Sequence, residues 1–281
     1  MSLPQARGLG VIDGPLLFFG GPYSNLQATL AIKAVAERLA IPPQQVICTG
    51  DVVAYCADPE ATVALIREWG IEVVMGNCEQ SLASDADDCG CGFEQGSTCD
   101  LLSGQWYPFA RRRLSADARA WMAGLPAALT LEFAGRSLRV VHGGVEQINR
   151  FLFQSTAIDV LAAEWDRSGA DWVVSGHAGI PFGRAIATGG WLNAGVIGMP
   201  ANDGSSDGWY MLLQHGATGP QASWHRMRYD ATAAAERMAA CSLAPAYASA
   251  LVSGCWPSQD VLPAEEAALC GKPLSVPVMS L

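Results

Sequence analysis

The sequence lacks any long hydrophobic run, although half of its 281 residues are apolar. No uninterrupted apolar segment approaches the roughly 20 residues that a membrane-spanning helix needs. The N-terminal segment MSLPQARGLG also lacks the basic and then apolar pattern of a signal peptide. These absences predict a cytoplasmic protein without a membrane partner. A chain of this length can bury a large core within a single domain.

Charged residues are scarce, at 16% of the chain, and the net charge is −10. The single run of basic side chains is Arg111-Arg112-Arg113. Because nucleic-acid binding depends on many contacts from Lys and Arg to phosphates, this distribution predicts no nucleic-acid polymer as a partner. No feature of the sequence predicts the oligomeric state.

Histidine is scarce too, with four residues in the chain. Two of them belong to a set of four polar side chains that follow the β-branched apolar runs VICTGD, VVMGNC, LRVVHGG and WVVSGH: Asp51, Asn77, His142 and His177. Carboxylate, amide and imidazole groups at successive strand ends are ligands for a hard-to-borderline metal ion. We therefore predict that these four residues hold one ion. Asn77 after a glycine also fits an ordinary turn residue.

The order of apolar and helical patterns predicts an α/β fold. Predicted strands at 15–21, 45–50 and 71–76 alternate with helices at 25–40 and 59–70. This alternation favours a sheet with mostly parallel strands. The sequence pattern after residue 113 predicts helices at 115–125 and 155–168, a hairpin that turns at Ala134-Gly135, and further strands up to residue 228. Residues 229–281 are Ala-rich and then Pro-punctuated, which predicts a helical C-terminal extension.

Nine cysteines form an unusually large and odd set for a protein in a reducing compartment, where buried thiols, metal ligands or redox sensors are expected. Residues 80–113 begin with an Asp-, Gly- and Cys-rich stretch that predicts an insertion or lid over the site. Its Cys89, Cys91 and Cys99 suggest a metal knuckle, with Cys78, Cys56 or Cys48 as a fourth ligand. Simple thiols in a glycine-rich lid are the alternative.

Several motifs in a fixed order give the chain a family resemblance from about residue 15 to residue 228. The segments are GDVVAYCADP (50–59), VVMGNCE (73–79), VVHGGV (140–145), SGHAGIPF (175–182) and LNAGVIGMPANDG (192–204). They resemble the GD, GNH, HG and GHxH motifs of the calcineurin-like metallophosphoesterases, particularly the small bacterial phosphodiesterases. The resemblance implies a four-layer α/β/β/α sandwich of two mixed sheets over residues 1–228, followed by the extension.

The resemblance also implies which metal positions survive. In that family one ion is held by the positions of Asp51, Asn77, His142 and His177, and all four ligands are present. The second ion uses a D-x-H pair and the last His of GHxH, and these positions hold Gly21, Tyr23 and Gly179. We therefore expect one divalent ion per chain, with Mn, Fe, Zn and Mg as candidates.

The function implied is that of a divergent metal-dependent phosphoesterase acting on a small phosphorylated substrate, a monoester or diester that includes nucleotides. Cys78, at the position of the GNH histidine, and Tyr23 are the predicted catalytic residues. Asn25 and Arg150 are the predicted substrate contacts. One alternative is a catalytically impaired binding or sensor protein on the same fold. Another is different chemistry at a metal site altered by cysteines, with Cys78 as a ligand, nucleophile or redox trigger.

Overall fold

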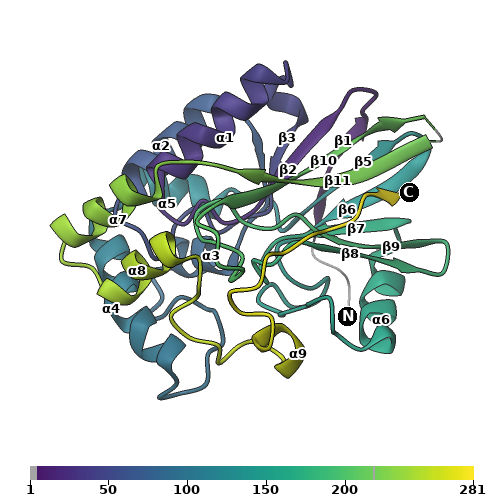
Figure 1. Cartoon of the computed structure of the whole chain (residues 1–281). Coiled ribbons are helices and arrows are strands. Elements are labelled where there is room, and N and C mark those ends of the chain that lie inside the picture. Colours follow the sequence, from purple (N-terminus) through teal and green to yellow (C-terminus); the bar gives the residue numbers. More distant parts are fainter. Residues whose placement is uncertain (1–4, 218) are drawn as a thin grey trace.

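The protein is built around two six-stranded mixed sheets that pack face to face (Figure 1). A computed structural model describes residues 5–217 and 219–281. The first sheet contains, in spatial order, β1 (Ala6–Val11), β5 (Ala128–Phe133), β6 (Arg136–Val140), β7 (Trp172–Ser175), β9 (Gly189–Asn193) and β8 (Phe182–Ile186). The second contains β12 (Met279–Ser280), β11 (Gly219–Met227), β10 (Gly208–Gly216), β2 (Leu16–Phe19), β3 (Val46–Cys48) and β4 (Glu72–Val73).

Alternating side chains of β2 show how the layers are held together. Leu16 and Phe18 join the apolar cluster between the two sheets, whereas Leu17 and Phe19 join the cluster beneath the helices. Successive side chains of a strand point to opposite faces, so both faces of β2 are buried. A strand buried on both faces appears in the sequence as a continuous apolar run.

Helices cover the outer face of each sheet and complete the four layers. The outer face of the second sheet shares a core with α1 (Leu26–Arg38), α2 (Pro59–Trp69), α3 (Asn77–Ala83), α4 (Thr98–Arg113), α5 (Ala116–Ala123), α7 (Ala231–Ala240) and α8 (Pro245–Ser253). The outer face of the first sheet packs against α6 (Ile158–Ser168). The predicted α/β/β/α sandwich of two mixed sheets is thus confirmed.

Several helix ends are set by local signals that the sequence displays. Asn25 caps α1, since its Oδ1 accepts a hydrogen bond from the Ala28 amide at 3.1 Å. Pro59 occupies the first turn of α2, where its missing N–H costs nothing. Ser115 caps α5 by accepting from the Ala118 amide at 3.1 Å. The predicted starts of these three helices are confirmed.

The structure differs from the sequence-based expectation at three places. The edge strand β1 was not expected, because its residues are largely exposed and include Gly8 and Gly10. The predicted strand at 71–76 is reduced to the two residues of β4. Within 80–105, only 84–97 lies outside a helix, because Ser97 accepts from the Asp100 amide and starts α4 at Thr98.

The C-terminal segment, residues 229–281, contains α7, α8, the short helix α9 (Ala264–Ala267) and β12. Met238 and Tyr247 belong to the same apolar cluster as α1 and α2, and β12 pairs with β11. In Figure 1 this segment runs in front of the sheets as the yellow-green part of the chain. The predicted domain boundary after residue 228 stays a prediction.

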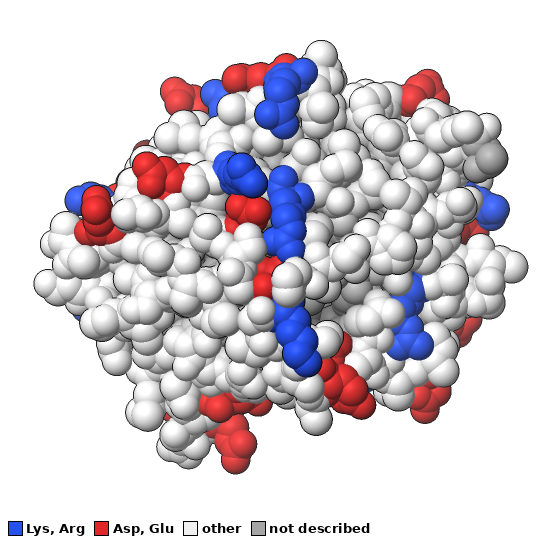
Figure 2. Space-filling view, in the orientation of Figure 1, with Lys and Arg blue, Asp and Glu red and all other residues white. Residues whose placement is uncertain are grey.

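Charge is sparse on the face shown in Figure 2, where basic side chains form a narrow row with acidic side chains beside them. This face presents no broad basic patch. None of the helices described has both the length and the apolarity to span a bilayer.

Candidate metal centre and adjoining pocket

The structure brings together the four side chains that the sequence predicts as metal ligands. Asp51 follows β3 and Asn77 begins α3 just after β4, while His142 follows β6 and His177 follows β7. β3 and β4 run parallel in one sheet, and β6 and β7 run parallel in the other. Each sheet therefore contributes two residues from the carboxyl ends of its strands, the usual place for a binding crevice in α/β folds.

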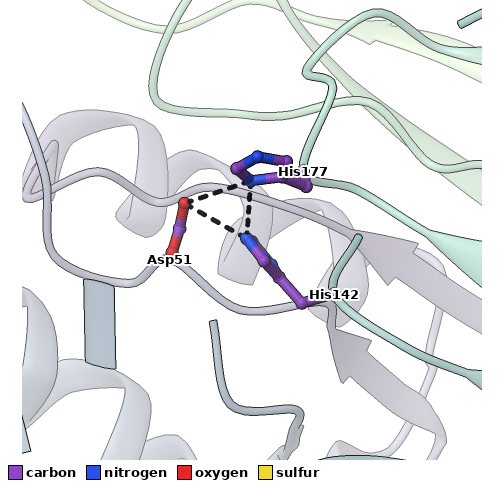
Figure 3. Close-up of side chains that lie close together, drawn as sticks. All are labelled: Asp51, His142 and His177. Carbon is purple, nitrogen blue, oxygen red and sulfur yellow. Dashed lines mark hydrogen bonds and ion pairs between the residues drawn. The ribbon is translucent and has the colours of Figure 1, made fainter. Parts of the chain in front are cut away.

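The donor atoms of the cluster lie close enough together to bind one ion. Nε2 of His142 lies 3.3 Å from Oδ2 of Asp51, 3.0 Å from Oδ1 of Asn77 and 2.9 Å from Nδ1 of His177. Figure 3 shows Asp51, His142 and His177 pointing toward one another. Within residues 5–217 and 219–281, these three form the one group of His, Cys, Asp or Glu side chains whose ligand atoms all lie within 4.8 Å.

The hydrogen bond of His142 to the backbone fixes which nitrogen faces the cluster as a ligand. Nδ1 of His142 lies 2.7 Å from the Thr49 carbonyl oxygen, which can only accept, so Nδ1 carries the proton. In the neutral ring Nε2 then presents a lone pair toward two further acceptors, the oxygens of Asp51 and Asn77. A cation placed between them satisfies all three groups. A backbone carbonyl that accepts from the other ring nitrogen is typical of metal-binding histidines.

The electrostatics of the cluster also favour a cation. Burial raises the pKa of Asp51, but the neighbouring histidines outweigh it and leave that pKa below its usual value. Burial lowers the pKa of His142, but Asp51 raises it above its usual value. Burial and the proximity of His142 lower the pKa of His177 to about 3. The buried site thus favours positive charge beside Asp51, and its two oxygen and two nitrogen donors suit a divalent ion.

The backbone of the Gly50-Asp51 loop is held in an uncommon conformation. Gly50 has φ of +98° and Asp51 has φ of +56°. A Cβ on Gly50 would lie 2.8 Å from the Gly76 amide nitrogen and 2.9 Å from Nδ1 of His142. The loop therefore needs glycine at this position. A left-handed aspartate costs of order 1–3 kcal/mol, which the surrounding contacts must offset.

Glu79 supplies those contacts, and the sequence analysis missed its role. Its fully buried carboxylate accepts hydrogen bonds from the amides of Asp51 at 2.7 Å, Gly76 at 3.0 Å and Val53 at 3.2 Å. Burial, followed by the Asp51 charge, raises the pKa of Glu79 to about 7. The available signal was an acidic residue three positions after Gly76 at a helix start, as in a capping box.

Comparison with known proteins agrees with this site and fold. The sequence model of the calcineurin-like phosphoesterase superfamily domain matches residues 27–218, more than half of the chain. The chain belongs to the calcineurin-like phosphoesterase superfamily. Members of this superfamily are metal-dependent, and the Asp51, His142 and His177 group is the place in the described chain where an ion can bind. No curated protein sequence matches the chain significantly.

Two solved structures support the superfamily fold. A protein from Pyrococcus horikoshii OT3, described only as hypothetical, has 15% identity and a TM-score of 0.72, covering 87% of this chain and all of its own. A metallophosphoesterase from Sphaerobacter thermophilus has 18% identity and a TM-score of 0.66, covering 86% of this chain and all of its own. At these identities the likeness concerns the fold.

The segment Cys89-Gly90-Cys91, here called the CGC segment, holds the amide of Asn77 in this member of the superfamily. Nδ2 of Asn77 donates to the Cys89 carbonyl oxygen at 2.9 Å and to Sγ of Cys91 at 3.3 Å. With Nδ2 held on that side, Oδ1 is turned toward His142. In the described part of the chain no three cysteine sulfurs meet the distance limit of a metal group, so the predicted metal knuckle is not formed there.

Cys91 should therefore tune metal affinity without touching the ion. We expect Cys91→Ala to weaken Mn²⁺ binding by about 10-fold, the lower end of the effect for residues that hydrogen-bond to a metal ligand. Cys91→Ser should recover part of the affinity, because its hydroxyl still accepts from Asn77. Cys241→Ala is the matched control, since this half-buried free thiol lies at the C-terminal end of α7. Calorimetric titration with Mn²⁺ measures all three, and equal affinities for the alanine variants would contradict the assignment.

Cys78 lies next to the CGC segment and is completely buried. Burial raises its pKa well above the usual range, and its thiol lies within hydrogen-bond reach of Cys91. The protein by itself therefore keeps this thiol protonated. Formation of a thiolate at Cys78 would require a bound cation beside it, and the catalytic role of Cys78 stays a prediction.

The two predicted substrate contacts have partners within the fold. Besides capping α1, Asn25 donates from Nδ2 to the Gly198 carbonyl oxygen at 3.1 Å. Arg150 lies 2.6 Å from Oε1 of Glu164, whose other oxygen accepts from the Val145 amide. Arg150 thus compensates a buried carboxylate that anchors the loop after His142. Contact of Asn25 or Arg150 with a substrate stays a prediction.

A pocket that six Phe, Tyr and Trp rings help to line, here called the aromatic pocket, opens beside His177. The space between its walls, with the open solvent at its mouth included, is about 590 Å³. The ring of Phe151 packs on His177 at a centroid distance of 4.3 Å. The lining residues are Tyr23, Tyr55, Phe93, Cys99, Phe151, His177, Ala178, Gly179, Val196, Met199, Tyr247, Trp256, Pro257, Ser258 and Val261.

Proposed function

We propose that this chain is a phosphoesterase that holds one divalent ion through Asp51, Asn77, His142 and His177 and hydrolyses a small phosphomonoester or phosphodiester. The convergence of four buried ligand atoms at the carboxyl ends of strands from both sheets carries this proposal. A divalent ion bound there polarises a phosphoryl oxygen and lowers the pKa of water toward ~7.

The chain's own groups prepare the site for this reaction. The Thr49 carbonyl keeps the lone pair of His142 turned inward, and Glu79 holds the Asp51 loop in place. Tyr23 lies on the wall of the aromatic pocket near Asp51. A phenol is protonated at neutral pH and donates one hydrogen bond, which suits a phosphoryl oxygen. Apolar rings on the other walls limit access of bulk water.

Aromatic rings occupy the space beside Gly21 and Gly179, two of the positions that are matched to ligands of a second ion. A Cβ on Gly21 would lie 2.4 Å from the ring of Tyr23, so a larger side chain there requires the ring to move. A Cβ on Gly179 would lie 3.3 Å from the ring of Trp256. Tyr23 and Trp256 thus fill the directions in which side chains at these two positions would extend. This arrangement supports a single ion per chain.

Elemental analysis of the purified protein tests the number of ions directly. We expect about one equivalent of a divalent metal per chain, because one complete ligand set is present. The His177→Ala variant should lose it, since it removes a nitrogen donor. Two equivalents would contradict the single-ion assignment, and a metal-free protein that gains no metal on incubation would contradict the proposed site.

Hydrolysis assays with Mn²⁺, Fe²⁺, Zn²⁺ and Mg²⁺ test the reaction itself. The substrates are p-nitrophenyl phosphate and bis(p-nitrophenyl) phosphate, with release of p-nitrophenol as the readout. Turnover that exceeds that of the Asp51→Ala variant supports the proposal. Thermal stabilisation by these esters without any product would instead identify a binding protein on the phosphoesterase fold.

A further inference from the structure

We propose that the aromatic pocket binds a flat, uncharged aromatic ring of the substrate, so that the substrate is an aryl or nucleoside ester with a single phosphate group. The inference rests on the proposed function for the phosphate end of the substrate. It concerns the other end, for which neither the ligand cluster nor the superfamily match provides a partner.

The pocket and the metal cluster share one residue, which fixes their relation. His177 contributes Nδ1 to the ligand cluster and also lines the pocket. A group in the pocket therefore lies beside the ion. Tyr23 and Trp256, whose rings lie over Gly21 and Gly179, form two of its walls. The space that a second ion and its ligands would need is thus replaced by aromatic surface.

The walls are pre-organised by contacts among the rings. Tyr55 packs against Tyr23 with centroids 4.8 Å apart and against Tyr247 with centroids 4.6 Å apart. On its far side Tyr55 also contacts Trp106, which is fully buried, at 5.1 Å. Two of these contacts, those with Tyr23 and Trp106, are edge-to-face, which is a favourable arrangement at these separations. Because the rings already hold one another in place, a further flat ring can bind against them at little cost in ordering side chains.

The pocket lacks charged walls, which limits what it can bind. No Lys, Arg, Asp or Glu occurs among its described lining residues. A polyphosphate needs cationic side chains, usually arginine or lysine, along its length. The chain's net charge of −10 disfavours such a ligand further. A ligand with a single phosphate group for the metal cluster and a neutral ring for the uncharged pocket fits both parts of the site.

The C-terminal segment supplies one side of the pocket and positions it. Trp256 donates from Nε1 to the Pro200 carbonyl oxygen at 2.7 Å and from its backbone amide to Oδ1 of Asn202 at 2.8 Å. Tyr247 comes from α8. Both residues lie beyond the 27–218 segment that matches the superfamily model. Selection of the ring is therefore a property that this chain adds to the shared fold.

Binding of phosphonates tests the pocket independently of turnover, because their C–P bond is not hydrolysed. Calorimetry on the Mn²⁺-loaded protein compares phenylphosphonate, a nucleoside 5′-phosphonate and methylphosphonate. We expect phenylphosphonate to bind about tenfold more tightly than methylphosphonate, since its ring is removed from water. Tight binding of the nucleoside compound as well indicates a nucleobase ligand, whereas preference for phenylphosphonate alone indicates a simple aryl ester.

Variants show whether the preference arises in the pocket. Trp256→Ala and Tyr247→Ala should reduce the phenyl-to-methyl preference to about twofold or less, while Trp256→Phe should retain most of it. Val252→Ala, an exposed change on α8, is the control for disturbance of the C-terminal segment. Circular dichroism checks that each variant is folded.

The outcomes separate this inference from the proposed function. Equal binding of phenyl and methyl compounds, together with ester hydrolysis, overturns the pocket assignment and leaves the phosphoesterase standing. A phenyl preference that depends on Trp256, without hydrolysis of any ester, supports the pocket and overturns the proposed function. A preference that survives in both alanine variants also overturns the pocket assignment.

Discussion

Replacement of His142 by alanine is expected to remove the bound metal and to lower kcat/KM for the best phosphoester substrate by about a thousandfold or more. Nε2 of His142 is the atom that lies within 3.3 Å of the other three ligand atoms. Its loss therefore leaves the Asp51 carboxylate buried without its neighbouring nitrogen donor. Metal content by elemental analysis and kcat/KM on the same preparation measure both effects.

The matched control for this variant is His215→Ala. His215 lies in β10, is exposed, and contacts the ring of Phe133 at a centroid distance of 5.1 Å. Its neighbour Leu213 pairs with Leu16 at the start of β2, so His215 lies at the opposite end of the sheet from the carboxyl strand ends that carry the cluster. Metal content and kcat/KM should therefore stay within about twofold of the unaltered protein. A His142→Ala protein that keeps both its metal and its activity would refute the assigned coordination sphere.

The fold and the four side chains that meet at the cluster could be predicted from the sequence because each depends on short-range patterns. The residues of β3 and those around β4 form apolar runs, and the Gly-containing loops after them carry Asp51 and Asn77. Such loops can be placed at the carboxyl ends of parallel strands without knowing the exact strand lengths. The placement is correct even for β4, which has only two residues.

The supporting contacts were less accessible because they join segments that no local pattern connects. Glu79 reaches the Asp51 loop across 28 positions of the sequence, and Cys91 reaches Asn77 across 14. Trp256 covers Gly179 from the C-terminal segment, which the sequence describes only as helical and punctuated by prolines. The spacing of apolar and polar residues in the sequence indicates which helix or strand a side chain belongs to. The residue that the side chain contacts depends on how the helices and strands pack in three dimensions.

Substitution of Glu79 by glutamine is expected to lower the free energy of unfolding of the metal-free protein by about 2–4 kcal/mol. The buried carboxylate accepts three backbone hydrogen bonds, two of them, from Asp51 and Gly76, at Oε2 and one, from Val53, at Oε1. Glutamine has a single carbonyl oxygen, and its NH₂ group must face at least one amide donor. At least one buried N–H therefore loses its acceptor.

The consequence for the site follows from the conformation that Glu79 stabilises. Asp51 keeps φ of +56° only while its amide is held, so release of that amide lets the carboxylate leave the cluster. Metal affinity should fall together with stability. Urea unfolding with excess chelator measures stability apart from metal binding, and calorimetry with Mn²⁺ measures affinity. Glu236→Gln, an exposed change on α7, is the isosteric control. Equal stabilities of the two variants would show that the Glu79 carboxylate is not what holds the loop.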